Sequence, residues 1–376
     1  MTDIVTPYMV AVLGALARRV DLTALFCSQT GTRGAEWAFD EPFPFRHRIL
    51  TGPTLRRRTP DAADLYPNPR ILGALLKTRP EVVISGAFSF PSLAGAVYGR
   101  LTGGRLIIHS DGTARSERLL GRAHLLARRV LLHEAAACVA NSEPAAARFV
   151  ELGAAASRVY RAPHTTDIAP FHAVGRARAA SPDPARPVTV LHVGRLIPRK
   201  GVDRLLKAVA LASSSDANVR LVLVGSGPEE ARLRALGARL GIADAVEFQG
   251  FVDQPGLPAV YAEADVFAFP TLDDPFGIVL LEAMAAGLPV VASPFGGATA
   301  DLVEEGRNGF VADPDDTPAW ACALVALASD RGLRRSMGGR AHEATLHRTP
   351  DTAADGYAAA VRAALNTGRR RSPRGR

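Results

Sequence analysis

Short runs of apolar residues alternate along the chain with longer stretches in which apolar residues recur every three or four positions. The short runs are typical of buried strands, and the longer stretches are typical of amphipathic helices. Strands are predicted at residues 22–26, 82–85, 105–109, 138–140, 159–161, 188–193, 219–224, 245–249, 266–269 and 289–292. Helices are predicted at residues 7–19, 69–78, 91–101, 117–133, 143–152, 202–212, 228–240, 277–286, 317–329, 331–346 and 352–365. This alternation favours parallel sheets with helices on both faces.

A proline-rich stretch divides this pattern into two similar halves. Residues 182–187 contain three prolines, which neither a helix nor a central strand tolerates. We therefore predict an α/β protein with two Rossmann-like domains facing an interdomain cleft. The predicted domains are residues 1–175 and 187–346, and the predicted linker is 176–186.

The start of the first domain is unusually short. Only residues 2–6 precede the first predicted helix, whereas strands commonly have about five or six residues. Either the first strand is very short or the true start lies upstream, and our hypothesis is the latter. Mass spectrometry of the native N-terminus tests it, because Met1 or Thr2 at that end would count against it.

The composition narrows the class of protein. The chain has 376 residues, of which 47% are hydrophobic and 22% charged, which excludes a wholly disordered chain. No run approaches the roughly 18 apolar residues that a membrane-spanning helix needs, and no secretory signal pattern is present. Cys27, Cys138 and Cys322 lack metal-type spacing, so we expect no disulfide framework, no metal site and a cytoplasmic location.

Positive charge is concentrated at the C-terminus. The net charge is +8, and five arginines lie within residues 368–376. We expect residues 367–376 to form a disordered basic tail. This tail is either solvated or in peripheral contact with an anionic surface at the inner face of the membrane. The run Arg56-Arg57-Arg58 is either solvated or in contact with an anionic acceptor or lipid surface. Nucleic acid is not an expected partner.

A basic loop follows the predicted strand at residues 188–193. Gly194 permits close approach of the backbone to a bound group, Arg195 offers a fork of donors, and Lys200 offers a point charge. Together they suit a diphosphate. Taken alone, the loop is equally well explained as a set of solvated charges.

A second candidate site follows the predicted strand at residues 266–269. Gly277 begins a predicted helix, whose free N–H groups and partial positive charge suit a phosphate. Glu282 lies further along, among Leu280, Leu281, Ala283 and Met284. A carboxylate in such an apolar helix needs a partner, so a ribose diol is a candidate ligand.

These motifs, taken in order, resemble a known family. They are Gly194-Arg195-Leu196, Lys200-Gly201, Leu223-Val224-Gly225-Ser226-Gly227-Pro228, Glu247-Phe248-Gln249-Gly250, and Asp274 to Glu282 followed by Ala283-Met284-Ala285-Ala286-Gly287-Leu288-Pro289-Val290-Val291. The combination resembles the retaining glycosyltransferases of family 4, which have the GT-B fold. The match covers about residues 188–346, and the N-terminal half matches loosely, mainly through Ile107-Ile108-His109-Ser110-Asp111-Gly112.

The resemblance implies a role for each matching residue. Arg195 and Lys200 would neutralise the diphosphate of the donor, and Glu282 would hold the ribose. Asp274 would contact the sugar, with the amides of Phe276, Gly277 and Ile278 near sugar and phosphate oxygens. Backbone at Gly194 and Phe251 would lie at the donor, the latter near the base. His109 would lie near the sugar and the acceptor, and residues 350–366 would pack back on the first domain.

Two positions depart from the family pattern. Asp274 stands where a glutamate is usual, so either the backbone lies closer, the donor is atypical or activity is low. Pro163-His164-Thr165-Thr166-Asp167 replaces the usual Asn-Gly pair after the last strand of the first half. We assign no consequence to the second departure.

Two other patterns imitate known ligand sites. Asp313 and Asp315 form a D-x-D pattern, but acids before a helix are expected on structural grounds. Gly225 and Gly227 resemble the start of a dinucleotide loop, yet Glu230 occupies the position of its third glycine. We therefore rank a metal site and an NAD enzyme low.

The sequence thus predicts a glycosyltransferase of the hexosyltransferase type. It would move a sugar from a nucleotide diphosphate sugar to an unidentified acceptor, with retention, without a metal and without a cofactor. Cell-envelope or polysaccharide biosynthesis is the expected setting. The alternatives are a non-catalytic relative that binds a nucleotide sugar or a partner protein, and a nucleotide-sugar epimerase of the same fold.

Overall fold

The computed structural model describes residues 1–28, 43–53, 55, 66–180, 187–215 and 217–369. Its elements form two compact units. Unit 1 comprises Met1–Asp167 together with Arg348–Arg376, and unit 2 comprises Ile168–His347. The expected cleft between the two units stays a prediction.

Unit 1 contains parallel strands and the helices that cover them. Its strands are β1 (Thr2–Ile4), β2 (Thr23–Ser28), β3 (Arg46–Ile49), β4 (Val82–Gly86), β5 (Arg105–Ser110), β6 (Ala135–Ala140) and β7 (Val159–Arg161). Its α-helices are α1 (Pro7–Ala17), α2 (Arg70–Thr78), α3 (Phe90–Thr102), α4 (Arg122–Glu134), α5 (Glu143–Glu151) and α14 (Pro350–Arg369). The strands form one sheet in the order β1-β2-β3 and another in the order β4-β5-β6-β7.

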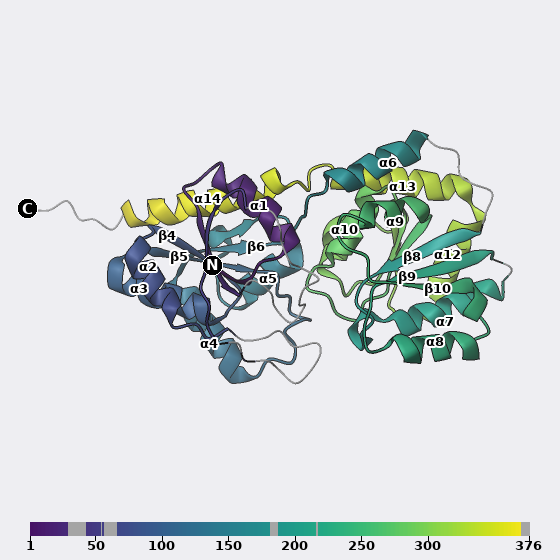
Figure 1. Cartoon of the computed structure of the whole chain (residues 1–376), viewed down its shortest axis with the longest axis horizontal. Coiled ribbons are helices and arrows are strands. Elements are labelled where there is room, and N and C mark those ends of the chain that lie inside the picture. Colours follow the sequence, from purple (N-terminus) through teal and green to yellow (C-terminus); the bar gives the residue numbers. More distant parts are fainter. Residues whose placement is uncertain (29–42, 54, 56–65, 181–186, 216, 370–376) are drawn as a thin grey trace, which may run out of the picture. The chain divides into compact units, whose positions relative to one another are not determined.

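Helices cover both faces of the sheet β4–β7. On one face, α2, α3, α4 and α5 enclose a core that includes Ile71, Ile108 and Phe149. On the other face, α1 and α14 enclose a core that includes Leu16 and Ile107 (Figure 1). The Gly86 N–H donates to the Met1 carbonyl at 2.9 Å, so β1 lies beside β4.

Helix α14 returns to unit 1 from the far end of the sequence. It contributes small buried side chains, which let a helix approach the sheet closely: Ala353, Ala354, Ala358, Ala360 and Ala364. Arg19 pairs with Asp351 at 2.9 Å and with Asp355 at 2.6 Å. The two carboxylates are exposed, and exposed ion pairs contribute little, so apolar burial holds this helix in place.

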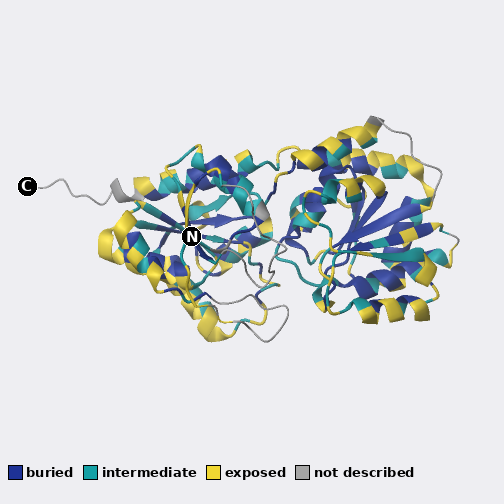
Figure 2. Ribbon diagram, in the orientation of Figure 1, coloured by how far each residue is buried: buried dark blue, intermediate teal, exposed yellow. Residues whose placement is uncertain are grey.

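Unit 2 is built on one six-stranded parallel sheet. Its strands are β8 (Val188–Val193), β9 (Val219–Val224), β10 (Val246–Gly250), β11 (Val266–Phe269), β12 (Val290–Ala292) and β13 (Gly309–Val311). Its α-helices are α6 (Ala169–Ala180), α7 (Val202–Ser213), α8 (Glu230–Arg239), α9 (Leu257–Glu263), α10 (Ile278–Ala285), α11 (Gly297–Leu302), α12 (Thr317–Ser329) and α13 (Arg331–Thr345). Strand β8 is buried along its whole length (Figure 2).

The strand order of unit 2 is β10-β9-β8-β11-β12-β13. Numbered along the unit, this is 3-2-1-4-5-6, the order of a Rossmann domain. The chain turns outward in opposite directions after β8 and β11, so a crevice forms at the carboxyl ends of these two neighbours. The predicted α/β fold class, with parallel sheets, is therefore confirmed.

The division of the chain differs from the predicted one. The boundary lies between Asp167 and Ile168, and residues 176–180, predicted as linker, are the last turn of α6. Phe171 of α6 is fully buried against Tyr261 of α9. Because this apolar face is buried, the segment is a helix of unit 2. The proline-rich stretch that follows it led to the wrong prediction of a linker. Residues 181–186, 56–58 and 370–376 lie outside the described residues.

Several element limits also differ from the predictions. The chain forms β3, β13, α6, α9 and α11, none of which was predicted. Helix α4 begins at Arg122, five residues later than expected, because residues 113–120 form turns around Thr113 and Glu117. Among the described residues, no helix is long and apolar enough to cross a membrane.

Candidate functional site

The carboxyl ends of β8 and β11 carry most of the residues predicted to bind a donor. Gly194, Arg195 and Lys200 follow β8, while Asp274, Phe276, Gly277 and Ile278 follow β11. The two loops are joined directly. The Arg199 guanidinium donates to the Asp273 carbonyl at 2.7 Å, and the Leu272 N–H donates to the Arg199 carbonyl at 2.9 Å.

Glycines allow the loop after β8 to pack against its neighbours. Gly201 has φ +67° and lies against the carbonyl of Pro270, where a Cβ would overlap it. Gly225 and Gly227, after β9, lie equally close to the carbonyls of Gly194 and Leu196. Close packing of two loops therefore explains the Gly-x-Gly pattern without a dinucleotide.

Lys200 and Asp274 form an ion pair across the two loops. Their side chains are 15% and 12% exposed, so the pair is largely shielded from water. Burial raises the pKa of the Asp274 carboxyl, but attraction to Lys200, a hydrogen bond from it and the nearby Arg199 outweigh burial, so the pKa is lowered overall. Asp274 also accepts the Phe276 N–H at 3.3 Å. The acid is therefore a carboxylate at neutral pH, held by both loops.

Helix α10 starts at this junction. Its cap, Gly277, has φ +92°, a left-handed conformation that favours glycine, and a Cβ there would overlap the Phe269 ring. The first N–H groups of a helix lack partners within the helix and carry partial positive charge. The start of α10 thus presents donors to the same region as Lys200. Arg195, in the loop after β8, is exposed.

Glu282 lies one turn into α10 and is buried, with 3% exposure. The Tyr261 hydroxyl of α9 donates to its Oε2 at 2.9 Å. Burial raises the pKa of Glu282 to about 7, although the hydrogen bond from Tyr261 opposes the shift. The partner expected for this carboxylate is therefore the Tyr261 hydroxyl. Its predicted contact with a ribose stays a prediction.

His192 of β8 is a residue that the sequence reasoning passed over. Its Nδ1 lies 3.1 Å from the Ala268 carbonyl oxygen, which only accepts, so Nδ1 carries the proton. Burial lowers the pKa of His192 to about 4, and its Nε2 has no partner among the described residues. This nitrogen lies beside Gly194, near Lys200. The signal was an ionisable residue within a strand that is otherwise apolar except for Thr189.

His109 lies near the end of strand β5 in unit 1. Its Nε2 contacts Oδ1 of Asn141, which follows β6, and burial lowers its pKa although Asp111 opposes the shift. It borders a cavity of about 170 Å³ at the carboxyl ends of the strands. The cavity is also lined by Tyr8, Asp111, Asn141, His164 and Tyr357. Among these, Asn141 and the two tyrosines had not been singled out from the sequence.

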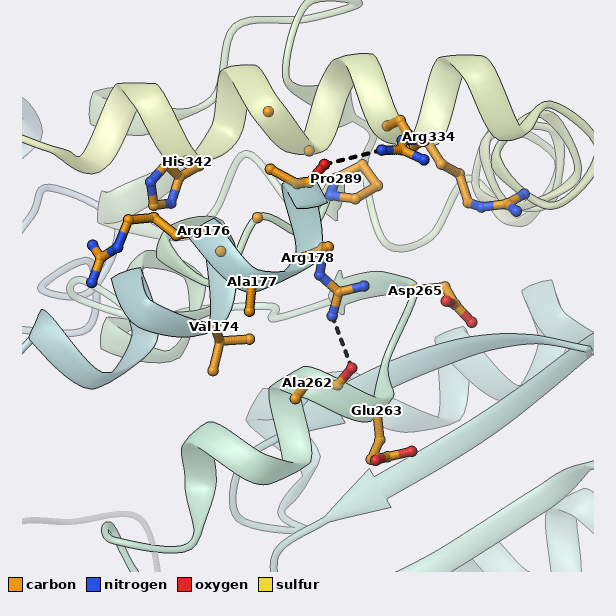
Figure 3. Close-up of a pocket in the computed structure, with 16 residues that line it drawn as sticks. Val174, Arg176, Ala177, Arg178, Ala262, Glu263, Asp265, Pro289, Arg334 and His342 are labelled. Atoms are coloured by element: carbon orange, nitrogen blue, oxygen red, sulfur yellow. Dashed lines mark hydrogen bonds between the residues drawn. The ribbon is translucent and has the colours of Figure 1, made fainter. Parts of the chain in front are cut away.

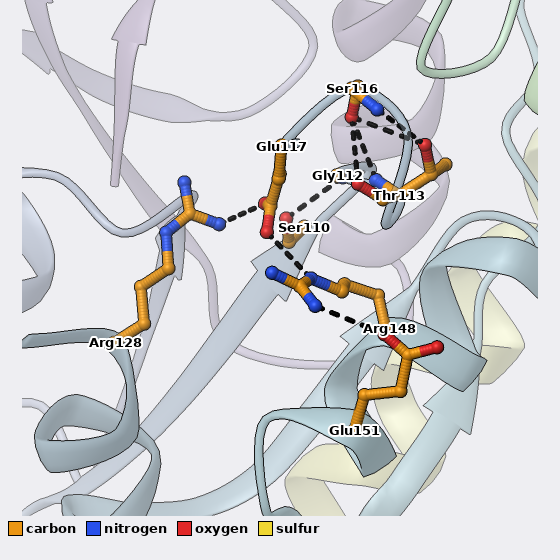
Figure 4. A network of polar contacts seen from close by, with 8 residues as sticks. All are labelled: Ser110, Gly112, Thr113, Ser116, Glu117, Arg128, Arg148 and Glu151. Carbon is orange, nitrogen blue, oxygen red and sulfur yellow. Dashed lines mark hydrogen bonds and ion pairs between the residues drawn. The ribbon is translucent and has the colours of Figure 1, made fainter. Parts of the chain in front are cut away.

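The loop that carries Asp111 is held in place by ion pairs with α4 and α5. Glu117, which is buried, pairs with Arg128 of α4 and with Arg148 of α5, the latter at 2.9 Å (Figure 4). Gly112 packs so closely on Glu117 that a Cβ would overlap its carboxylate. Loss of Glu117 would remove the carboxylate that both arginines share in a largely buried place. This network fixes the loop between β5 and α4.

A larger cavity, of about 650 Å³, lies in unit 2 at the amino ends of β11 and β12 (Figure 3). Two of the arginines that line it, Arg178 and Arg334, donate to backbone carbonyls. Arg178 donates to the carbonyls of Tyr261 at 2.8 Å and Ala286 at 3.1 Å, and Arg334 donates to Leu327 at 2.7 Å. Since these carbonyls end helices α9, α10 and α12, the cations cap helix C-termini. Its size therefore does not make this cavity the better candidate site.

The remaining predicted positions, Phe251 and the D-x-D pattern, make few contacts that define a site. Phe251 follows β10 and is 48% exposed, which leaves its ring open to a ligand. Asp316, next to the D-x-D pattern, caps α12 by accepting the Ala319 N–H at 3.0 Å, and Arg204 pairs with Asp315 at 3.0 Å. Among the residues that the structure describes, no group of three His, Cys, Asp or Glu could hold a metal ion.

Unit 2 is a Rossmann-like α/β domain with cations and a buried acid at its switch point, the place where such sheets commonly bind ligands. Solved structures of the whole fold agree. The chain is 20% identical to Anabaena Alr3699/HepE in complex with UDP, with a TM-score of 0.73 and 98% of each chain covered. It is 20% identical to sucrose-phosphate synthase from Thermosynechococcus elongatus, with a TM-score of 0.72 and 98% and 97% covered. Both are GT-B structures, and this chain has the same fold class.

Residues 175–344 match the family described as glycosyl transferases group 1. Over 162 residues, 41% of this chain and 42% of the relative, the chain is 40% identical to the GDP-mannose-dependent alpha-(1-6)-phosphatidylinositol monomannoside mannosyltransferase of Mycobacterium tuberculosis. Over 238 residues, 60% and 56%, it is 36% identical to the D-inositol 3-phosphate glycosyltransferase of Pseudarthrobacter chlorophenolicus. The chain spans about half the length of these relatives. The similarity to glycosyl transferases group 1 thus lies in residues 175–344.

Proposed function

We propose that this chain is a hexosyltransferase that moves a sugar from a nucleotide diphosphate sugar to an acceptor. The observation that carries the proposal is the junction of the loops after β8 and β11. There, Lys200, Asp274 and the start of α10 meet at the switch point of a Rossmann sheet, next to Arg195. We also propose that transfer retains the anomeric configuration, needs no metal ion and follows the pattern of family 4.

The chemistry assigns a task to each group. Breaking the bond between the anomeric carbon and the phosphate builds negative charge on the leaving oxygen. Fixed donors stabilise that charge best when they are already in place, as Lys200 and the start of α10 are. Arg195 adds a second cation, and its exposure lets it engage a ligand that arrives from solvent.

The ion pair of Lys200 with Asp274 holds both groups ready in the unliganded protein. An ammonium has three N–H donors, so Lys200 can keep one bond to Asp274 and give others to phosphate. Asp274 then lies where it accepts hydroxyl groups of the sugar. The usual glutamate is one methylene longer, and the contacts of Asp274 with Lys200 and the Phe276 N–H fix this shorter acid in place. We assign the ribose to Glu282 and the acceptor side of the sugar to His109.

The names of the relatives suggest which ligands to try first. GDP-mannose and inositol-containing or lipid-linked acceptors follow from the mannosyltransferase and the inositol phosphate glycosyltransferase. UDP and UDP-glucose follow from the solved neighbours. We propose a role in cell-envelope synthesis in the cytoplasm, with peripheral contact to an anionic membrane surface.

The test combines binding with turnover. Thermal shifts with GDP-, UDP-, ADP- and dTDP-sugars should single out one donor, because a ligand at 100 times its dissociation constant stabilises by about 2.7 kcal/mol. Arg195→Ala should remain folded and lose roughly ten- to a hundredfold in kcat/KM, as expected for a charge-assisted bond worth about 1.5–3 kcal/mol. Release of the nucleoside diphosphate measures turnover.

The matched control is Arg220→Ala, which removes an exposed arginine of β9 paired with Glu247. It should turn over normally. Normal turnover by Arg195→Ala as well would remove Arg195 from the site. Binding of a nucleotide sugar without release of the diphosphate, with every acceptor tried, would favour a non-catalytic binding relative.

A further inference from the structure

Exposed apolar side chains are concentrated on one layer of unit 1. Among the described residues, fourteen large hydrophobic side chains are exposed, and nine lie on α2, α3, α4, α5 or the turn before α4. They are Leu76, Phe90, Leu93, Val97, Leu101, Leu119, Leu126, Val130 and Val150. These helices cover the same face of the sheet β4–β7 through one core. Their outer side is therefore unusually apolar.

Helix α3 contributes a continuous stripe. Phe90, Leu93, Val97 and Leu101 are 38%, 51%, 37% and 65% exposed. Their spacings of three, four and four residues place them on one side of the helix. The opposite side, with Ala94 and other small residues, faces the core. The helix is therefore apolar on its outer side as well as on its inner side.

Helix α4 continues this apolar area and adds positive charge. Leu132 is its one buried residue, and most of the helix is exposed (Figure 2). Leu126 and Val130, one turn apart, are 62% and 54% exposed. Arg122 and Arg129 are exposed on the same helix and have no carboxylate partner among the described residues. Such a helix presents both lipid-like and anion-binding groups to its surroundings.

The two helices form one surface. The Arg100 guanidinium at the end of α3 binds Glu134 at the end of α4, with Nε to Oε2 at 3.0 Å. This pair neutralises the acid of α4, so the area keeps an excess of positive charge. We call the outer residues Phe90, Leu93, Val97, Leu101, Leu126 and Val130, with Arg122 and Arg129, the α3–α4 surface.

We propose that the α3–α4 surface docks onto an anionic lipid bilayer. This inference rests on the membrane contact proposed above and names the residues that make it. Apolar side chains enter the boundary of headgroups and acyl chains, while arginines meet lipid phosphates, at about 1 kcal/mol per basic residue. A second copy of the chain fits less well, because a two-fold contact through this surface sets its cations against their own copies.

The surface also lies close in sequence to the cavity of unit 1. Strand β5 ends at Ser110, and α4 begins at Arg122, so a short anchored loop joins the His109 side of that cavity to α4. The Glu117 network holds this loop rigidly to α4 and α5. Docking of α4 therefore fixes this edge of the cavity with respect to the bilayer, which suits an acceptor with a lipid tail.

The test is flotation of the full chain with vesicles. Vesicles of phosphatidylcholine alone are compared with vesicles of phosphatidylcholine and phosphatidylglycerol. The unmodified protein should float with the anionic vesicles only. Arg122→Gln with Arg129→Gln should weaken the partition coefficient about thirtyfold, since two basic residues contribute about 1 kcal/mol each. Leu126→Ser with Val130→Ser should weaken it at least tenfold and make the protein no less stable, because both side chains are exposed.

The matched control lies on unit 2. Leu211→Ser with Arg239→Glu removes an exposed leucine and an exposed arginine from α7 and α8 and should leave flotation unchanged. Unchanged flotation by the α3–α4 variants would overturn the proposed surface while the membrane contact stands. Failure of the unmodified protein to float with either vesicle would overturn both.

Sedimentation velocity tests whether a second copy of the chain, and not a bilayer, covers the α3–α4 surface. A dimer of the unmodified protein that Leu126→Ser with Val130→Ser dissociates would show that a second copy covers the surface, and would overturn the proposal. Sugar transfer to a water-soluble acceptor should stay normal in all these variants. A failure of the donor assignment would appear in that assay and would leave the flotation result untouched.

Discussion

The buried titratable side chains of unit 2 differ in the partners that stabilise their charged forms. Asp274 is stabilised as a carboxylate by Lys200. Burial raises the pKa of Glu282 to about 7, and the hydrogen bond from the Tyr261 hydroxyl offsets this shift only in part. His192 is held neutral, with a pKa lowered to about 4. A buried acid with a pKa raised in this way is a candidate functional residue.

The difference in unfolding free energy between Glu282→Gln and the unmodified protein should depend on pH. The folded protein keeps the Glu282 proton up to pH about 7, while the unfolded chain releases it near 4.5. Because the folded state then binds more protons, stability falls as the pH rises through this window, by up to about 3 kcal/mol. Glutamine carries no such cost. In urea unfolding from pH 4.5 to 8, the variant should therefore gain stability relative to the unmodified protein as the pH rises.

The contribution of His192 has the opposite sign. Its folded pKa is depressed, so its stabilising neutral state is lost as the pH falls below about 6.5 towards 4. This contribution is the same in both proteins and cancels in the comparison. Glu247→Gln, in the edge strand β10 with its side chain 42% exposed, is the control for the substitution itself. A flat difference for Glu282→Gln would mean that its carboxyl is already compensated.

At the scale of elements, the site depends on where α10 begins. Gly277 has φ +92° and lies against the ring of Phe269, which is itself buried in β11. The start of the helix is therefore set by a strand residue beneath it. No local helix signal other than the glycine itself fixes that position.

Gly277→Ala should destabilise the protein by about 3 kcal/mol, through a strained φ and a clash with a packed ring. It should also weaken donor binding, because the N–H groups of α10 would move. Gly241→Ala is the matched control. Gly241 has φ +71°, but a Cβ added there would meet no atom within 4 Å, so the substitution should cost about 1 kcal/mol and leave binding unchanged. Equal effects of the two substitutions in thermal unfolding and nucleotide titration would refute the packing argument.

Local pattern identified the central strands well and the peripheral elements poorly. The predicted limits of β8, β9 and β11 are those observed, since apolar runs of β-branched residues seldom form anything else in an α/β chain. The strand β3, with exposed Arg46, His47 and Arg48, carries no apolar signal. Helix α6 was not predicted, because its burial depends on Tyr261, which lies far away in sequence.

At the scale of the whole molecule, the two units have separate cores. The two apolar clusters of unit 2 contain buried residues from Val188 to Met337 and from Ile168 to Ala341, all within unit 2. In unit 1, one apolar cluster combines residues of the N-terminal segment with α14. A unit with its own core can fold by itself, whereas a unit built from both ends of the chain needs both ends.

A fragment of residues 168–347 should therefore unfold cooperatively and bind the donor nucleotide, as calorimetry and nucleotide titration would show. Residues 1–167 alone should not fold stably, because they leave the surface that α14 covers exposed. Adding residues 348–376 through a short linker should restore a cooperative transition. A stable fold of residues 1–167 alone would show that α14 contributes little to the core.

The sequence alone determined the βα alternation, the strand centres of unit 2 and the chemistry of the loops after β8 and β11, because apolar runs, glycines and paired charges are local properties. The tertiary structure decided which distant residues meet. It paired Lys200 with Asp274, placed Tyr261 on Glu282, left His192 Nε2 without a partner among the described residues and left α3 and α4 apolar towards solvent. Burial and pairing depend on residues far apart in the chain, so no local pattern specifies them.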